Sequence, residues 1–246
     1  MLQLRGVRVA YGTDVAPALD DVGLEIAAGE CVALVGPSGS GKTSLLRSLN
    51  GTVPLAAGSI RIEGVDVGTL RGRDLRRLRT RVAIIAQQHD LVDRLTVLQN
   101  VMAGALGRWS TLHALRFLIA PSAAEIAEAR AALASVGIAE KLRSRTSELS
   151  GGQQQRVAIA RALVQHPAVI LADEPIASLD PALGEQIVRL LCDLARERGL
   201  ALLCSLHQTD LAGRYFDRVV ELVHGRIRLD RVTERAGPLL ERDHAG

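Results

Sequence analysis

A glycine-rich loop near the N-terminus constrains the fold more than any other feature of this chain. Residues 31–35 form a short apolar run, residues 36–43 read Gly-Pro-Ser-Gly-Ser-Gly-Lys-Thr, and residues 44–49 have a helical pattern. Glycines let backbone N–H groups turn inward where a side chain would obstruct the turn. The pattern predicts a buried strand, a phosphate-binding loop and a helix whose positive dipole end faces the anion.

Two side chains of this phosphate loop (residues 36–43) have chemistry of their own. We expect Lys42 to reach the β- and γ-phosphates of a nucleotide and the Thr43 hydroxyl to bind Mg²⁺. The alternative is a glycine-rich turn that matches by chance, and the flanking strand and helix argue against it. The residues that we expect to contact the phosphates are Gly36, Pro37, Ser38, Gly39, Ser40, Gly41, Lys42, Thr43 and Ser44.

A second glycine turn, Leu-Ser-Gly-Gly-Gln at residues 149–153, follows about a hundred residues later. It can be interpreted as a helix cap for the apolar stripe of residues 153–164, although two adjacent glycines are more than a cap needs. A glycine turn that opens a helix is also an anion-binding site, available for the far side of the same γ-phosphate. Two half-sites on one chain imply that two chains share each nucleotide. The residues concerned are Ser150, Gly151, Gly152 and Gln153.

Polar side chains follow two of the apolar runs. Asp173 and Glu174 come directly after residues 169–172, and His207 follows residues 200–206. Such positions lie at the carboxyl edge of a parallel sheet, where these sheets bind ligands. We expect Asp173 to bind a magnesium-bound water and Glu174 to polarise the attacking water. An ordinary acidic turn would explain the composition of this segment but not its position.

Hydrophobic periodicity predicts two kinds of strand. Residues 2–9, 22–26 and 59–62 alternate between apolar and polar, as antiparallel strands with one wet face do. Continuous apolar runs are typical of buried parallel strands separated by helices. The expected fold class is therefore α/β, a doubly wound P-loop NTPase (RecA-like) core with an antiparallel β edge layer. The runs are residues 31–35, 82–86, 169–172, 200–204 and 219–222.

Helical patterns replace the strand signal between residues 90 and 149. They cover residues 97–106 and 122–136, and Ser122 with Glu125 has the spacing of a capping box. We expect one domain with an inserted α-helical subdomain. Its parts are a catalytic core with the antiparallel edge (1–89 and 150–231), the helical insert (90–149) and a loosely held C-terminal tail (232–246).

Composition argues against several classes of protein. The apolar runs stop at about five residues, whereas a membrane-spanning helix needs roughly 20. The N-terminus lacks the pattern of a secretory signal, so we expect a cytosolic protein whose membrane role depends on a partner. A formal charge of +3 is too small to indicate nucleic acid, and the arginines of residues 71–81 are typical of a solvated helix face. Cys31, Cys192 and Cys204 are expected to be reduced thiols.

The two glycine turns, the pair Asp173-Glu174 and His207 resemble the ATP-binding subunit of an ABC transporter over nearly the whole chain. The resemblance implies an ATP hydrolase with Mg²⁺ that dimerises with a second copy of itself. The second glycine turn would then close over ATP held by the opposite subunit. On its own residues, His207 could equally be structural. The resemblance implies that it hydrogen-bonds the γ-phosphate.

Three further residues acquire roles from the resemblance. Gln87, rather than the adjacent Gln88, would contact Mg²⁺ or the attacking water and report the nucleotide state to the insert. Tyr11 would stack on adenine, the alternative being a half-buried tyrosine at a strand end. Asp180 matches the family's dimer-crossing loop, and it could also cap a helix that begins with Pro181.

A finer resemblance points to phosphonate importer ATPases. It is carried by residues 87–92, 101–108 and 110–111, in or beside the insert. In the family this region receives a coupling helix from an integral membrane permease, so these segments would recognise the permease and not the solute. Uptake of a phosphonate or a related phosphorus oxyanion is therefore inferred by association. The implied location is the cytoplasmic face of the plasma membrane, with a periplasmic or extracytoplasmic solute-binding protein as an indirect partner and no nucleic acid.

Three alternatives remain open on the sequence. The chain could serve an ABC transporter for another oxyanion or for amino acids. A non-transport ABC ATPase of DNA repair or translation is less favoured, because such proteins insert coiled coils, metal-binding cysteines or a second cassette. A stand-alone P-loop kinase leaves the second glycine turn unexplained.

Overall fold

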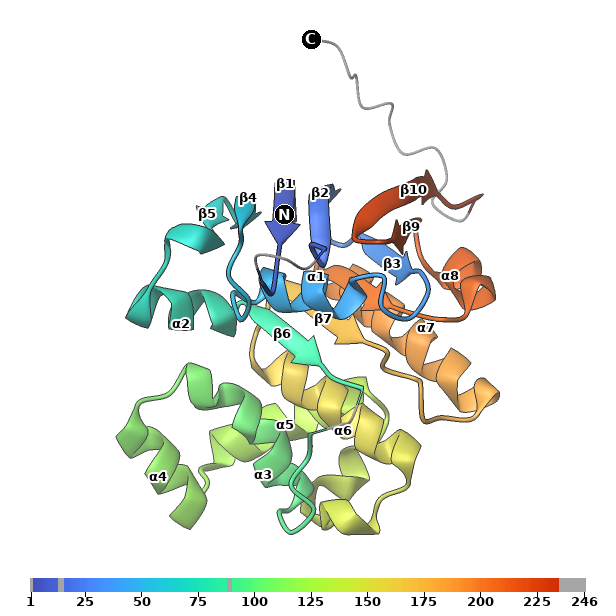
Figure 1. Cartoon of the computed structure of the whole chain (residues 1–246). Coiled ribbons are helices and arrows are strands. Elements are labelled where there is room, and N and C mark those ends of the chain that lie inside the picture. The colour runs from blue at the N-terminus through green and yellow to red at the C-terminus, as the bar shows by residue number, and fades with distance from the viewer. Residues whose placement is uncertain (1, 13–15, 88–89, 235–246) are drawn as a thin grey trace.

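Parallel strands form most of the larger of two β-sheets in the computed structural model (Figure 1), which describes residues 2–12, 16–87 and 90–234. The strand order is β10-β9-β3-β8-β7-β6, and β10 alone runs antiparallel to its neighbour. The strands are β3 (Cys31–Val35), β6 (Val82–Ile85), β7 (Val169–Asp173), β8 (Ala201–Ser205), β9 (Arg218–Val223) and β10 (Arg226–Val232).

The continuous apolar runs become strands buried on both faces, as expected. Every residue of β3 and β8 is buried. Strand β8 begins and ends one residue later than the predicted 200–204, and β6 ends one residue before Ala86. Strand β10 was not predicted, although residues 226–230 alternate between charged and apolar side chains; it contains Val232, which was assigned to the tail. Residues 235–246 of that tail lie outside the described residues.

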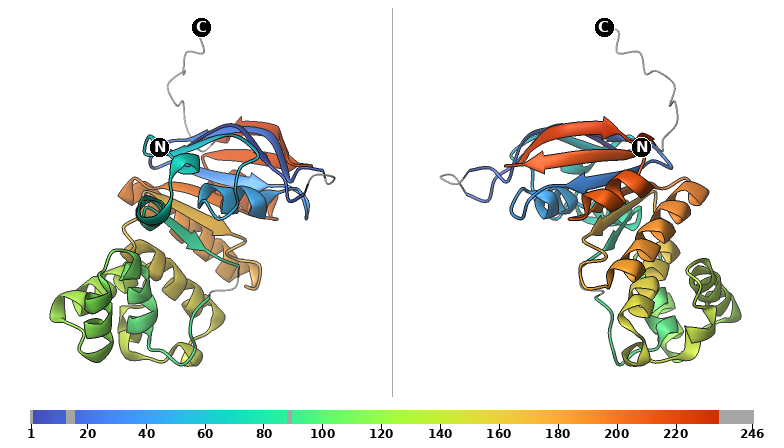
Figure 2. Two further views of the ribbon diagram at one scale, coloured as in Figure 1. Left: turned by 60° about the vertical axis from the view of Figure 1, so that its left-hand side comes forward. Right: turned by 90° about the vertical axis from the view of Figure 1, so that its right-hand side faces the viewer.

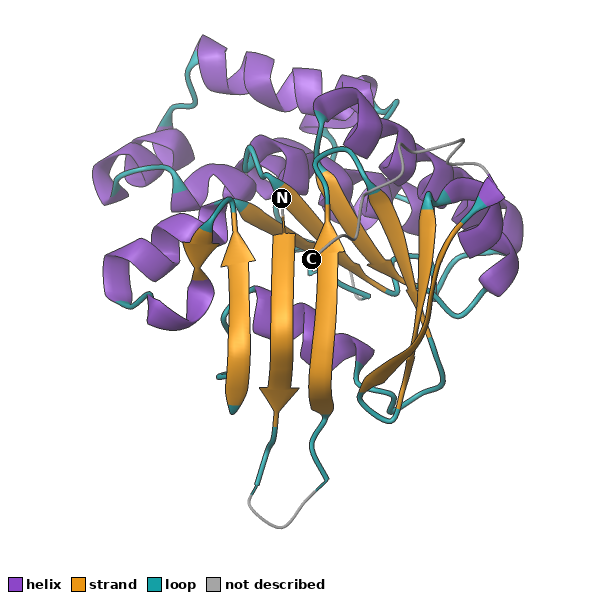
Figure 3. Ribbon diagram, turned by 90° about the horizontal axis from the view of Figure 1, so that it is seen from above, coloured by secondary structure: helices purple, strands orange, loops and turns teal. Residues whose placement is uncertain are grey.

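The smaller sheet is antiparallel, with the strand order β2-β1-β4-β5. Its strand β2 lies beside β10 (Figure 3), where the Asp20 N–H donates to the Gly225 carbonyl and Arg226 pairs with Asp20. The turn η1 (Val67–Thr69) and helix α2 (Gly72–Thr80) follow this sheet, and α2 exposes most of its arginines, as predicted. The strands are β1 (Leu2–Val9), β2 (Leu19–Ile26), β4 (Ala57–Ile62) and β5 (Val65–Asp66).

Two apolar clusters lie on opposite faces of the larger sheet. One contains the antiparallel sheet and Leu45, Leu46 and Leu49 of α1 (Lys42–Leu49). The other contains the apolar faces of α6 (Gly151–Val164) and α7 (Pro181–Arg198). Helix α8 (Thr209–Tyr215) adds to the second cluster. The two glycine-rich turns therefore open helices that pack in different cores.

Helices occupy the segment between β6 and β7, well below the antiparallel sheet in Figures 1 and 2. The predicted helix 97–106 is shorter than expected, because α3 ends at Met102 and continues as a 3₁₀ turn. There Gly104 packs so closely on α6 that a Cβ would lie 2.1 Å from the Arg161 carbonyl oxygen. The elements are α3 (Val97–Met102), η2 (Ala103–Gly107), α4 (Thr111–Ile119), α5 (Ala123–Ser135), η3 (Ala139–Arg143) and η4 (Thr146–Glu148).

Capping and thiol chemistry agree with the sequence. Ser122 and Glu125 form the predicted capping box at the start of α5. Cys31, Cys192 and Cys204 are buried and free, and burial raises the pKa of the Cys204 thiol. Across the described residues, the structure holds no helix with both the length and the apolar character required to span a membrane.

Candidate functional site

The phosphate loop is held against the backbone of other elements. Gly36, Gly39 and Gly41 have positive φ angles of 147°, 78° and 107°, which favour glycine. A Cβ at Gly36 would lie 2.1 Å from the Leu222 carbonyl oxygen, and one at Gly41 would lie 2.4 Å from that of Ala18. Side chains at these two positions would displace the loop. The loop conformation is therefore fixed by its surroundings as well as by its glycines.

Lys42 and Ser40 provide donors inside this loop. Lys42 is 5% exposed, and its Nζ donates to the carbonyl oxygens of Gly36 at 2.8 Å and Pro37 at 3.2 Å. The Ser40 hydroxyl is buried and has no hydrogen-bond partner among residues 2–12, 16–87 and 90–234. Helix α1 begins here without a side-chain cap. An ammonium group, an unpaired hydroxyl and the N-terminus of a helix together fit a bound phosphate.

Tyr11 lies beside the start of α1. Its hydroxyl is 3.1 Å from the Ser44 Oγ, and the side chain is 61% exposed. The ring is therefore next to the phosphate loop with most of its surface free. This position is compatible with the predicted stacking on a nucleotide base.

The strand register brings the other predicted residues to the same edge of the sheet. Ser205 of β8 pairs with Asp173 of β7 on one side and with Leu34 of β3 on the other. Ile85 of β6 pairs with Ala172, so Gln87 follows at the level of the acidic pair. Gln87 is exposed, and Gln88 lies outside the described residues. The phosphate loop and Asp173 thus belong to one edge, with β8 between their strands.

Ser205 joins the two acidic residues, and no pattern in the sequence indicates this role. Its buried hydroxyl donates to the Asp173 Oδ1 at 2.8 Å and accepts the Glu174 N–H at 2.8 Å. A serine at the end of an apolar strand has no distinctive pattern. Only the register of β7 and β8 shows that it is opposite an aspartate.

Glu174 pairs with His207 at the exit of the two strands. The His207 Nε2 lies 2.6 Å from the Glu174 Oε1. Glu174 has a φ of 48°, in the left-handed region that non-glycine residues rarely adopt. The Glu174 carboxylate contacts His207 and the Asp173 carboxylate accepts from Ser205, so the two carboxylates have different partners. Strained backbone of this kind is common at functional sites.

The second glycine turn caps α6. Ser150 and Gln153 form a capping box at the start of the helix. A side chain at Gly152 would meet Leu183 of α7, and the Asp180 Oδ1 caps α7 by accepting the Leu183 N–H at 3.0 Å. The cap predicted at each position is therefore present. The turn adjoins the helices of residues 97–149, and it is not next to α1 in Figures 1 and 2.

The groups predicted to bind Mg²⁺, directly or through a bound water, come from three separate segments. They are the Thr43 hydroxyl, the Asp173 carboxylate and the Gln87 amide. Mg²⁺ prefers oxygen ligands and commonly keeps water and phosphate oxygens in its remaining positions. The described part of the chain contains no group of three or more His, Cys, Asp or Glu side chains suited to a metal. The residues present fit a magnesium ion that is bound together with a phosphate.

The ABC transporter family model matches residues 19–177, which include the phosphate loop, the second glycine turn and the acidic pair. The chain belongs to the ABC transporter family. This result confirms the resemblance inferred from the sequence. The match to the family covers more than half of the chain.

Relatives with curated names match nearly the full length. The phosphonates import ATP-binding protein PhnC of Frankia casuarinae is 45% identical, over 97% of this chain and 97% of the relative. The phosphite import ATP-binding protein PxtA of Stutzerimonas stutzeri is 44% identical, over 100% of this chain and 88% of the relative.

A solved ABC transporter cassette has the same fold. The dimeric structure of the bacterial cassette MJ0796 superposes with a TM-score of 0.81 at 32% identity, over 94% of this chain and 98% of that one. The same cassette in a post-hydrolysis state, bound to ADP and Pi, gives a TM-score of 0.80. The expected P-loop NTPase fold class is confirmed.

Proposed function

We propose that the chain is the ATP-binding subunit of an ABC importer. It hydrolyses ATP in a nucleotide-sandwich dimer and drives uptake of a phosphonate or a related phosphorus oxyanion through a partner permease. The observation that carries this proposal is the separation of two anion-binding turns on one chain. The phosphate loop opens α1 in one core, and the second glycine turn opens α6 in the other.

The names of the relatives support the solute class. One is named as an ATP-binding protein for phosphonates import and the other as one for phosphite import, and both solutes are phosphorus oxyanions. Identities of 45% and 44% extend over nearly the whole chain, including the helical segment in which the branch resemblance lies. That segment recognises a permease, so the solute follows from the transporter to which this subunit belongs.

The carboxyl edge of the larger sheet supports hydrolysis. Lys42 and the Ser40 hydroxyl hold the phosphates, while Thr43, Asp173 and Gln87 hold Mg²⁺, which neutralises phosphate charge when bound. Glu174 orients the attacking water and His207 donates to the γ-phosphate. The 2.6 Å contact between these two side chains holds them next to each other at this edge of the sheet.

Dimerisation completes the site. Ser150, Gly151, Gly152 and Gln153 offer backbone and hydroxyl donors at the start of α6, and this turn is remote from the phosphate loop of its own chain. In the proposed dimer each copy supplies these donors to the nucleotide held by the other. Asp180 caps α7, and in the proposed dimer it belongs to the loop that contacts the other copy.

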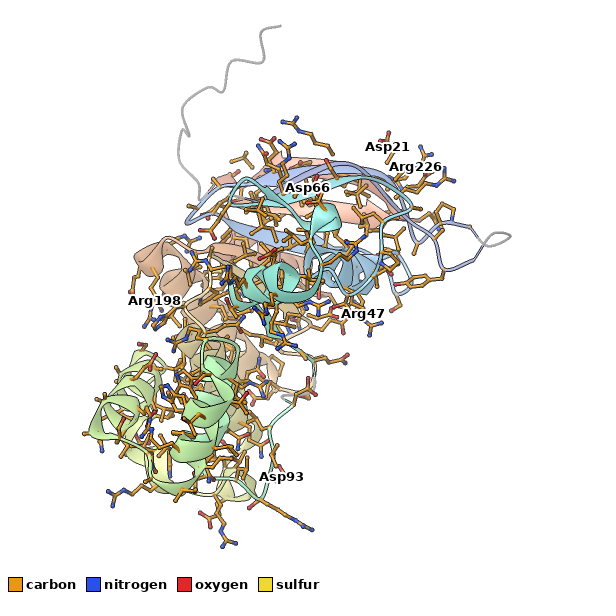
Figure 4. The ribbon with its side chains drawn as sticks, turned by 90° about the vertical axis from the view of Figure 1, so that its left-hand side faces the viewer. Asp21, Arg47, Asp66, Asp93, Arg198 and Arg226 are labelled. Atoms are coloured by element: carbon orange, nitrogen blue, oxygen red, sulfur yellow. The ribbon has the colours of Figure 1, made fainter. Side chains whose placement is uncertain are left out.

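The side of the molecule that carries α2 and the helical segment supports permease docking (Figure 4). A groove of about 380 Å³ is lined by α2, β6, η2 and α6, and Ile84 within it is 43% exposed. Helix α4 adds an apolar stripe beyond η2, in which four side chains are at least half exposed. They are Leu112, Leu115, Leu118 and Ile119. A permease bound here holds the chain at the cytoplasmic face of the membrane, and a solute-binding protein delivers the solute from the opposite side.

Two substitutions test the hydrolysis site. Lys42→Ala removes the cation from the phosphates and should bind ATP poorly. Glu174→Gln keeps the shape of the side chain but loses the carboxylate, so it should bind ATP and accumulate a dimer that does not turn over. Equal ATP affinity for Lys42→Ala and the wild type, or near-normal hydrolysis by Glu174→Gln, would refute these assignments.

Uptake tests the transport function. The chain should support uptake of a phosphonate or phosphite when co-expressed with the permease and solute-binding protein of a phosphonate importer, and Glu174→Gln should abolish uptake while the complex still assembles. Cysteines placed along residues 90–106 should crosslink to the permease. Crosslinks confined to β1, with none from the helical segment, would contradict the docking face.

A further inference from the structure

Gln155 is a buried polar side chain without a partner. It lies in α6 with 0% exposure, and neither its Nε2 nor its Oε1 has a hydrogen-bond partner within the described ranges of the chain. Buried amides in native proteins are nearly always hydrogen-bonded, because an unpaired buried group has lost its water without compensation. Ser40 is the other described residue with such an atom, and its hydroxyl lies in the phosphate loop. At Ser40 the proposed nucleotide phosphate would supply the partner, whereas Gln155 is not in the phosphate loop and needs another explanation.

The polar neighbours of Gln155 all have partners. Gln153 belongs to the capping box of α6. Gln154 donates to two backbone carbonyls just before the helix, at 3.4 and 3.3 Å. Arg156 donates to the Val136 carbonyl at 2.7 Å. The missing hydrogen bonds are therefore specific to Gln155 and are not a property of this end of the helix.

Gln155 belongs to the face of α6 that is turned toward α7. It follows Gly152 by three residues, and residues at this spacing share a helix face. A side chain at Gly152 would meet Leu183, near the start of α7. The loop that leads into α7 begins at Glu174 and ends at the cap Asp180. The unpaired amide therefore shares a face of α6 with Gly152, which packs against the start of α7, the helix that follows this loop.

We propose that Gln155 is a positioning residue whose amide is hydrogen-bonded only when the nucleotide sandwich closes. Its partners are then backbone groups of residues 174–183. This inference rests on the proposed function. Closure presses Ser150 against the nucleotide of the opposite copy, and that force moves α6 relative to the loop that holds Glu174. An amide that gains partners on closure favours the closed arrangement, because only differential interactions shift such an equilibrium. The same hydrogen bonds also hold the Glu174 loop in place in the closed dimer, which is the state that hydrolyses ATP.

Gln155→Leu removes the polar atoms and keeps a side chain of similar size. It should leave the stability of the monomer unchanged or raised, and it should weaken the ATP-bound dimer. Without nucleotide, the melting temperature should stay equal to that of the parent or rise, because no unpaired amide is left buried. In a Glu174→Gln background with ATP, the dimer dissociation constant should rise about tenfold, which is about 1.4 kcal/mol. ATP affinity measured below the concentration at which dimers form should change less than about twofold. Sedimentation and thermal unfolding measure these quantities.

Gln154→Leu is the matched control, because its amide already has partners. It should lower the melting temperature. Gln155→Met is a second variant, which avoids the branched side chain of leucine. Lower melting temperatures for both Gln155 variants would overturn the inference, since the amide would then be satisfied without closure. An unchanged dimer dissociation constant in the Gln155 variants would overturn the role of Gln155 and leave the proposed function standing. Failure of Glu174→Gln itself to dimerise would overturn the proposed assembly and, with it, the role of Gln155.

Discussion

The hydroxyl of Ser205 lies 2.8 Å from the Oδ1 of Asp173 on the neighbouring strand. The same hydroxyl accepts the Glu174 N–H, so one buried side chain fixes both the direction of the Asp173 carboxylate and the backbone turn at Glu174. The two acidic residues are therefore positioned as one unit. Any change at Ser205 should disturb metal binding and water activation together.

Ser205→Ala should lower hydrolysis much more than ATP affinity. The substitution leaves the Asp173 Oδ1 and the Glu174 N–H without their partner, and it should lower the free energy of unfolding by about 1–3 kcal/mol. We expect kcat to fall by roughly tenfold, because Asp173 and Glu174 would no longer be held in place. A tenfold fall corresponds to a loss of about 1.4 kcal/mol of transition-state stabilisation. Steady-state kinetics and urea denaturation measure the two effects.

Ser48→Ala is the control for Ser205→Ala. Ser48 is buried in α1, and its hydroxyl donates only to the Leu45 carbonyl, within its own helix. This variant should lose some stability and keep its kcat. If Ser205→Ala behaves in the same way as Ser48→Ala, the serine has no part in positioning the acidic pair.

Ser150→Arg should block the ATP-dependent dimer and leave binding at the phosphate loop intact. The substitution places a long cation at the exposed start of α6, where the nucleotide of the opposite copy must approach. Ser147→Arg, which adds the same charge at an exposed position three residues earlier, is the control and should dimerise. Sedimentation with ATP in the Glu174→Gln background separates these cases. A Ser150→Arg protein that still dimerises would rule out the shared site.

Tyr11→Ala should weaken ATP binding and Tyr11→Phe should not. Loss of a stacked ring costs about 1–3 kcal/mol at other nucleic-base sites, which corresponds to roughly fivefold to 150-fold in affinity. Phenylalanine keeps the ring but loses the 3.1 Å contact with Ser44. Titration with a fluorescent ATP analogue measures both. Equal affinity for Tyr11→Ala and the wild type would assign the tyrosine a structural role.

The ionised carboxylate of Glu125 should make the stability of the helical segment depend on pH in the acid range. Burial raises the pKa of this carboxyl, but hydrogen bonds from the Ser122 backbone and from His113, Ser122 and Arg116 outweigh burial and lower the pKa to about 2. A folded-state pKa below the unfolded value means that the carboxylate contributes its full stabilisation above about pH 4.5 and loses it as the pH falls toward 2.

Glu125→Gln tests that sensitivity. It should lower the melting temperature at neutral pH, and the difference from the wild type should shrink as the pH falls from about 4.5 toward 2. Thermal unfolding across this range measures the difference. A gap that stays constant down to pH 3 would show that the ionised carboxylate is not the source of the stabilisation.

Local sequence patterns correctly predicted the elements that depend on residues close to one another in the chain. The phosphate loop, the buried runs of β3 and β7 and the cap at Ser150 are each determined by a few neighbouring residues. The capping box at Ser122 is of the same kind. Such features can be found from one sequence because their physical cause lies within a single turn or strand.

Features that depend on distant contacts could not be predicted. The helix 97–106 ends early because Gly104 packs against the Arg161 carbonyl of α6. Strand β10 is mostly exposed, and it joins the sheet by pairing with β9. Ser205 becomes important only through its register with Asp173. In each case the decisive neighbour is more than 50 residues away or belongs to an adjacent strand.

The parallel strands contribute side chains to both apolar clusters, and this arrangement determines how the protein should unfold. In β3, Cys31, Ala33 and Val35 enter one cluster, while Val32 and Leu34 enter the other. Loss of either core would therefore expose one side of every central strand. We expect the two halves, although they hold different parts of the site, to melt in a single cooperative transition. Heat would then remove nucleotide binding and the dimer-forming turn at the same temperature.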